Sequence, residues 1–467
     1  MRIVYSSYKY IGQKWVLEIP EHWEIKRLKA IFSMRTERNS PVVTDNILSL
    51  TAKQGVVPYS KKEGVGGNKP KDDLSKYNIA RENDLIVNCM NVVSGAAGVS
   101  KYFGAISPVY YALYLRAEEN VWYYHHIFRL TPFQRSLIGL GKGILMHESD
   151  SGKLNTVRMR ISMDYLGNVL LPVPPRFEQD QIVRFLDWKV SRINKLISVK
   201  RKQIALLHER QSVHISHIVT RGLRNGVATK DSGAEWLGDI PEHWHTMRCK
   251  YLFSERDERS QDGSEQHLSM SQKYGLVPDS QLDERRMLSE SYVGGKLCDK
   301  DDLVLNRLKA HLGVFALAPQ SGVISPDYTV LRPNTARILP SFAETLLKSD
   351  RCRGELCIRV RGIIEGFWRL YTDDFNTIVL PVPPLDEQAE IMEYIVEFRD
   401  KAKKYEDTLT QEISSLQELK ARLISDTVTG KIDVRGIQIP EYEFAEENID
   451  TENDESMEGM ECETYEE

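Results

Sequence analysis

The sequence has few cysteines, and none of them forms a closely spaced pair. Its six cysteines among 467 residues include no Cys-x-x-Cys spacing, which argues against a zinc ribbon and against a dense disulfide framework. No apolar run reaches the roughly 18–20 residues that a membrane helix needs, and the first residues lack the apolar stretch of a secretory signal. These absences predict a protein of the reducing cytoplasm that has no membrane partner.

The motifs of several enzyme classes are missing as well. The sequence contains no P-loop, no Gly-x-Ser-x-Gly elbow, no His-Glu-x-x-His helix and no Asn/Asp-Pro-Pro-aromatic tetrapeptide. His214 and His217 stand three residues apart on a predicted helix, but no carboxylate or cysteine accompanies them. A solvated or packed position is therefore favoured over a metal site for these histidines. We predict no catalytic residues, no metal and no cofactor.

Basic residues are absent from one end of the chain. Residues 441–467 carry thirteen Asp and Glu and no Lys or Arg, so this acidic tail is predicted to be disordered. Residues 1–440 hold 62 basic and 54 acidic side chains, so the net charge of −5 for the whole chain becomes +8 without the tail. A mildly basic body permits nucleic-acid binding.

The strongest positive feature is an internal repeat. Residues 19–39 and 240–260 are identical at 12 of 21 positions, and both begin with Ile-Pro-Glu-His-Trp. Each copy closes with Leu-Pro-Val-Pro-Pro followed by Glu-Gln, at residues 171–179 and 380–388. A repeat of roughly 210–220 residues is too long for a solenoid unit, and it indicates a duplicated domain with a duplicated appendage.

Each copy changes character once. Short apolar runs broken by Gly, Asn, Asp and Pro predict strands and turns of an α+β domain, and the stretch after each Pro-Pro lacks both helix breakers and predicts a long helix. The predicted boundaries are a first domain at 1–175, a first helix at 176–225, a second domain at 226–384, a second helix at 385–436 and an acidic disordered tail at 437–467.

The second helix contains a coiled-coil seam. Its apolar positions from Ile391 to Leu423 step alternately by four and three residues, with Glu412 as the one polar member. The first helix is less regular, and the same spacing places Lys189 and Lys200 in its seam. The first helix has a net charge of +7 and the second of −4, which favours pairing with each other over independent packing on their own domains. At ~1.5 Å per residue, each helix would span about 60 Å and act as a spacer.

Two domains opened by Ile-Pro-Glu-His-Trp and closed by Pro-Val-Pro-Pro with Glu-Gln before a long helix resemble the DNA specificity subunit of type I restriction–modification systems. The resemblance covers residues 8–436, and the acidic tail departs from it. It implies an α+β chain with a pseudo-two-fold internal repeat. Two globular target-recognition domains would be separated by two long helices that form an antiparallel coiled coil.

The resemblance also implies a function and partners. Each domain would read one half of a bipartite target in double-stranded DNA. The coil would dock two DNA methyltransferase (modification) subunits and, through them, restriction/translocase subunits, while this chain itself catalyses nothing. Two alternatives remain: a coiled-coil scaffold that binds proteins without reading DNA sequence, and a methyltransferase or nuclease with unrecognised motifs.

Candidate DNA contacts lie in loops that recur in both copies. Asn and Gln side chains recognise adenine, Arg and Lys recognise guanine, and Lys, Arg and Ser bind phosphates. The first group of candidates is Lys53, Gln54, Lys61 and Lys62, with Gln272 and Lys273 in the second copy. The second group follows an Asp-Leu-aliphatic-aliphatic-Asn strand and contains Asn88, Asn91 and Ser94, with Asn306, Arg307, Lys309 and His311 in the second copy.

Further candidates are basic residues suited to phosphate contacts: Lys142, Lys153, Arg359, Arg361 and Arg369. Asn88 and Asn306 have a second interpretation as strand-end caps. The tryptophans of the repeated opening motif, Trp23 and Trp244, are expected to anchor their domains in the core and not to stack on DNA.

Overall fold

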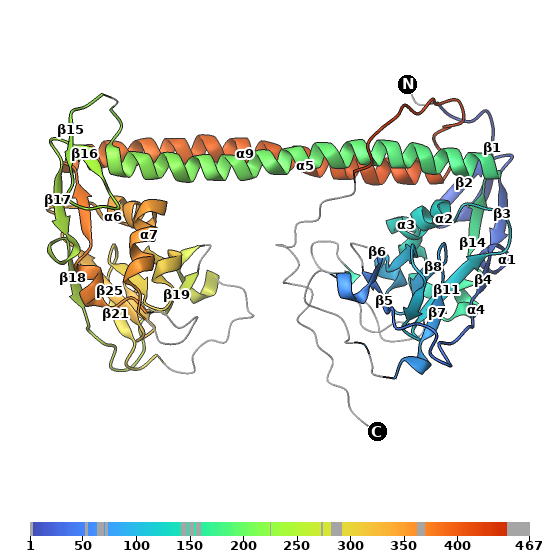
Figure 1. The fold of residues 1–467 in the computed structure, drawn as a ribbon, viewed down its shortest axis with the longest axis horizontal. Coiled ribbons are helices and arrows are strands. Elements are labelled where there is room, and N and C mark those ends of the chain that lie inside the picture. The colour runs from blue at the N-terminus through green and yellow to red at the C-terminus, as the bar shows by residue number, and fades with distance from the viewer. Residues whose placement is uncertain are drawn as a thin grey trace. The chain divides into compact units, whose positions relative to one another are not determined.

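The computed structural model describes residues 3–51, 55–62, 70, 73–141, 147–148, 154–155, 160–224, 226–271, 274–281, 292–361 and 369–445. The chain forms two compact units. Unit 1 comprises Met1–Arg201 with Gln411–Glu467, and unit 2 comprises Lys202–Thr410. Each unit holds one α+β domain and part of each long helix, α5 (Arg176–Arg221) and α9 (Leu385–Val428) (Figure 1).

The domain of unit 1 is built from short strands and small helices. Its strands are β1 (Tyr8–Gln13), β2 (Val16–Pro20), β3 (Glu24–Arg27), β4 (Phe32–Met34), β5 (Leu48–Thr51), β6 (Gly55–Pro58), β7 (Asn78–Ala80), β8 (Leu85–Asn88), β9 (Ala97–Val99), β10 (Gly104–Ile106), β11 (Tyr110–Leu115), β12 (His147–Glu148), β13 (Leu154–Asn155) and β14 (Leu170–Val173). Its helices are α1 (Leu28–Ile31), α2 (Val121–Phe128), α3 (Thr131–Ser136) and α4 (Met163–Leu166).

The domain of unit 2 repeats this plan. Its strands are β15 (Thr229–Asp231), β16 (Asp239–Pro241), β17 (His245–Arg248), β18 (Phe253–Arg256), β19 (Leu268–Ser271), β20 (Gly275–Pro278), β21 (Lys296–Cys298), β22 (Leu303–Asn306), β23 (Phe315–Leu317), β24 (Gly322–Ile324), β25 (Tyr328–Pro333) and β26 (Val379–Val382). Its helices are α6 (Pro340–Lys348), α7 (Asp350–Arg359) and α8 (Thr372–Asn376).

Both domains centre on a four-stranded antiparallel sheet with the same strand order. The order is β4-β11-β8-β9 in unit 1 and β18-β25-β22-β23 in unit 2. Strand β8 is buried on both faces: Leu85 and Val87 belong to the main core, while Ile86 packs in a smaller core under the β5–β6 hairpin. Successive side chains of a strand point to opposite faces, so a sheet covered on both sides requires the unbroken apolar run found there.

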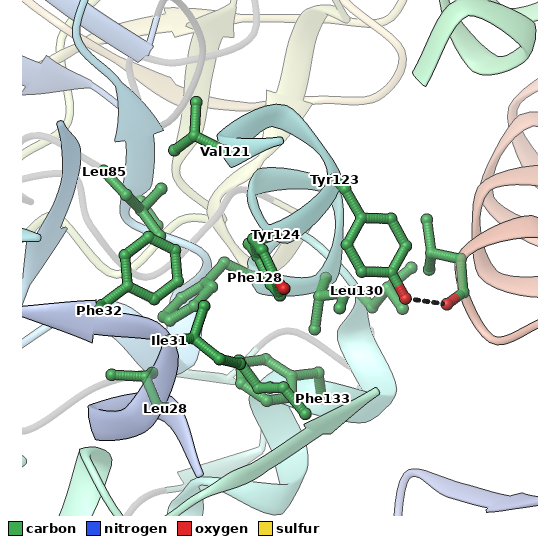
Figure 2. Packing of buried hydrophobic residues seen from close by; sticks show 14 of the residues in the cluster. Leu28, Ile31, Phe32, Leu85, Val121, Tyr123, Tyr124, Phe128, Leu130 and Phe133 are labelled. Carbon is green, nitrogen blue, oxygen red and sulfur yellow. Dashed lines mark hydrogen bonds between the residues drawn. The ribbon is translucent and has the colours of Figure 1, made fainter. Parts of the chain in front are cut away.

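The main core of unit 1 joins the sheet to the helices. Figure 2 shows Phe32 of β4 beside Leu85 of β8, with Phe128 of α2 and Phe133 of α3 in the same cluster, and all three phenylalanines are buried. Tyr123 points the other way, and its hydroxyl donates to the carbonyl of Val428 in α9 at 2.9 Å. The end of α9 is therefore part of the core of unit 1.

Within unit 1, polar side chains connect α5 to α9. Lys200 pairs with Glu412, and the Lys420 ammonium donates to Asn194 Oδ1 at 3.0 Å. The partner of the later residue on α5 is the earlier one on α9, so the two helices run antiparallel. The pairing of a cationic seam residue with Glu412 agrees with the opposite charges of the two helices.

Within unit 2, the other parts of the same helices also pair. His208 Nε2 lies 3.1 Å from Glu406 Oε2, and the ring of His214 packs on Phe398 with centroids 4.7 Å apart. The direction is again antiparallel. Both units therefore confirm the predicted antiparallel coiled coil of two long helices.

The seam of α9 departs from the predicted heptad at two places. Tyr405 and Leu419 are assigned to the seam by the spacing, but they are 49% and 53% exposed. A straight α-helix has 3.6 residues per turn and a heptad needs 3.5, so a strict heptad drifts around the helix by ~20° per repeat. The sequence prediction is wrong at these two positions, while Ile391, Ile395 and Leu409 are buried as expected.

The start of the acidic tail packs on α5. The Ser191 hydroxyl donates to the Glu443 carbonyl at 3.0 Å and accepts from the Ala445 backbone N–H at 2.6 Å, and the Asn194 amide donates to the Ala445 carbonyl at 3.2 Å. Ile437 and Ile439 also pack against the core of unit 1, so the expectation of disorder for the whole tail does not hold for residues 437–445. The rest of the tail lies outside the described residues.

Candidate functional site

The two repeated motifs meet around one buried carboxylate in unit 1. Trp23 Nε1 donates to Glu178 Oε2 at 2.7 Å, the Tyr5 hydroxyl donates to the same oxygen at 3.2 Å, and His22 Nε2 lies 2.6 Å from Oε1. The Glu178 side chain is fully buried, and the Arg435 guanidinium approaches it to 3.8 Å. A buried carboxylate needs such partners, so this cluster fastens the first β-strands to the start of α5.

Unit 2 contains the same cluster. Trp244 Nε1 donates to Glu387 Oε2 at 3.0 Å, and His243 Nε2 lies 2.8 Å from the same oxygen. We call the two clusters clamp 1 (His22, Trp23 and Glu178) and clamp 2 (His243, Trp244 and Glu387). Both indole rings are fully buried, which confirms the expected structural role of the tryptophans.

The glutamines next to the clamp glutamates bind backbone. Gln179 and Gln388 donate to the carbonyls of Pro174 and Pro383 at 2.9 and 2.8 Å. Their side-chain oxygens accept from the backbone N–H that precedes α2 or α6, in both cases at 2.8 Å. The Glu-Gln pair of the sequence motif therefore positions the domain on its helix.

The loop that follows the central strand has the same backbone in both units. We call residues 88–96 loop 1 and residues 306–314 loop 2. The side-chain oxygens of Asn88 and Asn306 accept from the N–H two residues further on, at 3.0 and 3.1 Å. Their own N–H groups donate to the carbonyl eight residues later, at 3.0 and 3.2 Å. These asparagines have the cap geometry of their second interpretation.

Glycine ends the turn inside each loop. Gly95 has φ +82° and Gly313 has φ +77°, a left-handed conformation that other residues adopt at a cost of roughly 1–2 kcal/mol. Each glycine follows a single 3₁₀ turn, at Val92–Ser94 and Ala310–Leu312. The glycine and the first asparagine are shared by both copies, so they hold one backbone while the residues between them differ.

The side chains that differ stand on equivalent positions. Asn91 has φ −120° and ψ 15°, and Lys309 has φ −126° and ψ 15°. Both side chains are exposed, and so is Ser94. Arg307 is partly buried and donates from Nε to the Asp327 carbonyl at 2.8 Å.

A basic residue lies beside each loop. The Leu370 N–H donates to the Arg307 carbonyl at 2.9 Å, which places the preceding Arg369 next to loop 2. In unit 1 the Ile161 N–H donates to the Cys89 carbonyl at 2.9 Å, and the residue before it is Arg160.

Arg160 was missed by the sequence prediction. The repeat could have identified it, because Arg160 and Arg369 are separated by 209 residues, the same offset as the two Pro-Val-Pro-Pro motifs. Both arginines are exposed. The structure thus adds one basic side chain to the candidates of unit 1 and brings Arg369 together with the loop 2 candidates.

Other candidates lie elsewhere or are engaged. Lys61 and Lys62 end the turn after β6, and the backbone of His311 lies in the turn of loop 2. The Arg359 guanidinium binds Glu355 and the Thr377 hydroxyl, and that of Arg361 pairs with Asp374. Six candidates lie outside the described residues: Lys53, Gln54, Lys142, Lys153, Gln272 and Lys273.

The described part of the chain contains no group of three or more His, Cys, Asp and Glu side chains arranged to hold a metal ion. Burial raises the pKa of the Cys298 thiol to about 11 and also raises the pKa of the Cys89 thiol within loop 1. Both thiols stay protonated near neutral pH. Within the ranges given for the structure, no helix has the length and apolar character needed to cross a membrane.

Comparison with known proteins identifies relatives along nearly the whole chain, although no protein-family model matches it. A putative type I restriction enzyme MjaX specificity subunit of Methanocaldococcus jannaschii is 22% identical over 449 residues, which are 90% of this chain and 95% of that protein. The MjaVIII specificity subunit of the same organism is 21% identical over 461 residues, 94% of this chain and all of that protein.

The resemblance to type I specificity subunits is confirmed. A solved structure described as the complex assembly and conformational transition of the type I R-M system contains a chain with the same fold, at a TM-score of 0.61 and 13% identity. The match covers 89% of this chain and 99% of that chain. The sequence similarity to type I specificity subunits thus extends along nearly the whole chain, and the fold is shared with a chain of that type I R-M structure.

Proposed function

We propose that this chain is the DNA-recognition subunit of a type I restriction–modification complex and that each domain reads one half of a bipartite target. The observation that carries the proposal is the pair of loops with one backbone and two sets of exposed side chains. A protein that recognises two different half-sites with a duplicated domain needs this combination. Base identity is read by exposed side chains, while a fixed backbone positions them.

The physical advantage of two domains is discrimination. Each wrong base pair costs a DNA-binding protein about 1–3 kcal/mol, and a half-site of a few base pairs cannot select among the many competing sites of a genome. Two linked readers combine their discrimination. Domain 1 (1–175) and domain 2 (226–384) are the two readers in this proposal, joined by the helices at 176–225 and 385–436.

The remaining parts of the proposal concern partners. The paired helices dock two DNA methyltransferase subunits, and restriction/translocase subunits bind through these, so that methyl transfer and cleavage belong to other chains in the cytoplasm. The DNA contacts are drawn from the candidates named in the sequence. Loops 1 and 2 are the best supported, because each carries exposed side chains that differ between the copies on one backbone. The mildly basic body, with its net charge of +8 over residues 1–440, favours association with DNA.

The test is methylome sequencing of cells with and without this chain. The expected result is a bipartite methylated motif that disappears when the chain is deleted. Exchanging residues 20–170 for those of a relative should then change one half of the motif and leave the other half intact. A methylome that is identical in both strains, or an exchange that alters both halves together, would contradict the proposal.

A further inference from the structure

Loops 1 and 2 have the same backbone conformation but different exposed side chains. Asn91 and Lys309 occupy one position of a shared backbone, with φ and ψ agreeing within a few degrees. Their chemistry is different: one is a neutral amide that can both donate and accept, and the other is a cation that only donates. The difference is therefore one of recognition chemistry on an unchanged scaffold.

Neither side chain is needed to build its loop. The Asn91 carbonyl accepts from the N–H groups of Ser94 and Ala96 at 3.0 and 3.1 Å, and its N–H donates to the Asn88 carbonyl at 3.2 Å. The backbone of Lys309 makes the same three bonds in loop 2, at 3.0, 3.2 and 3.0 Å. In both turns the side chain at this position makes no capping bond. The residue type at these two positions can therefore change to suit a ligand without disrupting the loop.

The arginine beside each loop does not vary. Arg160 and Arg369 each precede the residue whose N–H binds the loop carbonyl, and both are exposed. The Arg160 guanidinium lies beside the Tyr111 hydroxyl. A phosphate contact is the same for every DNA sequence, whereas a base contact must change with the base. A constant arginine next to a variable side chain matches that division.

Resting on the proposed function, we propose that Asn91 and Lys309 are equivalent specificity-determining residues of the two half-sites. Asn91 reads an adenine in the half-site of domain 1, because an amide pairs with adenine N6 and N7. Lys309 reads a guanine in the half-site of domain 2, because a cation donates to guanine O6 and N7. Arg160 and Arg369 bind a DNA phosphate beside each of these bases.

The deciding experiment exchanges the two side chains in the full-length chain. Cells that lack the native copy are complemented with the wild type, Asn91→Lys or Lys309→Asn, and their methylomes are sequenced. Asn91→Lys should change one base pair of one half-site from A·T to G·C, and Lys309→Asn should make the reverse change in the other half-site. Each variant should methylate the original motif about 10-fold to 100-fold less efficiently.

Two control variants make the same changes in charge as Asn91→Lys and Lys309→Asn, but at positions before β8 and β22 and not after them. Glu82 and Lys300 are exposed repeat partners that precede β8 and β22, so Glu82→Gln and Lys300→Asn should leave the motif unchanged. If Asn91→Lys or Lys309→Asn abolishes methylation, the corresponding alanine variant decides: it should relax the motif at a single base pair. An unchanged motif, or loss of all methylation with alanine too, overturns this assignment.

Failure of the proposed function gives a different result. If the wild-type chain supports no bipartite motif, both proposals fall. If the wild type supports such a motif and Asn91→Lys and Lys309→Asn both leave it intact, only the assignment of the two readers falls. The two outcomes are distinguished by the wild-type methylome alone.

The arginines are tested by the salt dependence of binding to a duplex that carries the motif. Arg160→Ala and Arg369→Ala should each reduce the slope of log K against log salt by about 0.9, with the same loss of affinity for an unrelated duplex. Lysine at either position should restore the slope. An unchanged slope in both alanine variants would remove the arginines from the proposal.

Discussion

Clamp 1 and clamp 2 use the same residue types, but they are covered differently. Glu178 is fully buried and has Tyr5 and Arg435 around it, whereas the Glu387 side chain keeps 15% of its surface exposed. The extra cover of clamp 1 comes from the segment before β1, with Tyr5, and the segment after α9, with Arg435. The repeated motif therefore determines that the tryptophan donates a hydrogen bond to the glutamate. The segments packed over the cluster determine how far the carboxylate is exposed to water.

Loops 1 and 2 differ between the units in a similar way: residues that build the loop are shared, and exposed residues are not. In loops 1 and 2, the asparagines that bind backbone, Asn88 and Asn306, and the glycines in the left-handed conformation are the same in both copies. Exposed positions between them differ, as Asn91 and Lys309 do. The two units thus share a backbone and differ in their exposed side chains. The predictions below test this comparison, beginning with buried residues and ending with exposed ones.

The largest effect should come from removing the clamp carboxylates. Glu178→Ala leaves three donors without an acceptor at a fully buried site and should cost about 3–5 kcal/mol. Glu387→Ala acts at a partly exposed site, where water replaces the carboxylate, and should cost about 1–2 kcal/mol. Hydrogen exchange of peptides containing Trp23 and Trp244 in the full-length chain, at increasing urea, measures both. Equal losses would show that cover does not matter.

The next effect concerns the glycines that end the long helices against the clamps. Gly430 has φ +76° and Gly222 has φ +79°. A Cβ on Gly430 would overlap the Pro20 ring, whereas one on Gly222 would meet Trp244 at 3.2 Å. We expect Gly430→Ala to cost about 3 kcal/mol and Gly222→Ala about 1–2 kcal/mol.

The same exchange measurement checks the glycine pair, and the clamp peptides should respond only in the unit that carries the substitution. Gly139→Ala is a matched control, because Gly139 has no heavy atom within 4 Å of an added Cβ and should change stability by less than about 0.5 kcal/mol. A loss for Gly222→Ala as large as that for Gly430→Ala would contradict the packing difference.

Acid should distinguish the two domains by a smaller amount. Burial lowers the pKa of His126 in α2 from 6.5 to about 4. Between pH 6.5 and pH 4, His126 is protonated in the unfolded chain but neutral in the folded domain. This histidine therefore lowers the free energy of unfolding by about 1.4 kcal/mol per pH unit in that range and adds no further loss below pH 4. Domain 2 has Thr345 at the corresponding position of α6.

The measurement is the stability of each unit by hydrogen exchange between pH 7 and 5. Domain 1 of the wild type should weaken more than domain 2, and His126→Thr should remove part of the difference. His125 contributes in the same direction, because burial lowers its pKa as well. A difference between the domains that His126→Thr leaves unchanged would assign the acid response to other groups.

The smallest effect belongs to the segment that covers α5. Ser191 binds the backbone of Glu443 and Ala445, while the repeat partner of Ser191 in α9 is Asp400, which is exposed. Ser191→Ala should weaken the docking of this segment by about 1 kcal/mol, which is close to a fivefold increase in proteolysis after Glu443. Asp400→Ala is the control and should leave the cleavage rate unchanged.

Much of the fold was predictable because its signals are local or repeated. The strand of Leu85 to Val87 is marked by its apolar run, and the long helices are marked by the absence of Pro and Gly. The duplication itself exposed the motifs, including Trp23 and Trp244 as core residues. The seam of α9 was predicted less well, because a small difference in helix pitch accumulates along the helix and moves Tyr405 out of the contact.

Contacts between distant parts of the chain were decided by tertiary structure alone. The sequence contains both Trp23 and Glu178 but does not say that they share a hydrogen bond, since they lie 155 residues apart. Arg160 became a neighbour of loop 1 for the same reason. The sequence by itself determined the duplication, the element types and the two sets of loop side chains, because these depend on local pattern. Burial of the clamp carboxylates, the packing of residues 441–445 and the grouping of loop with arginine depend on distances that exist only after the chain has folded.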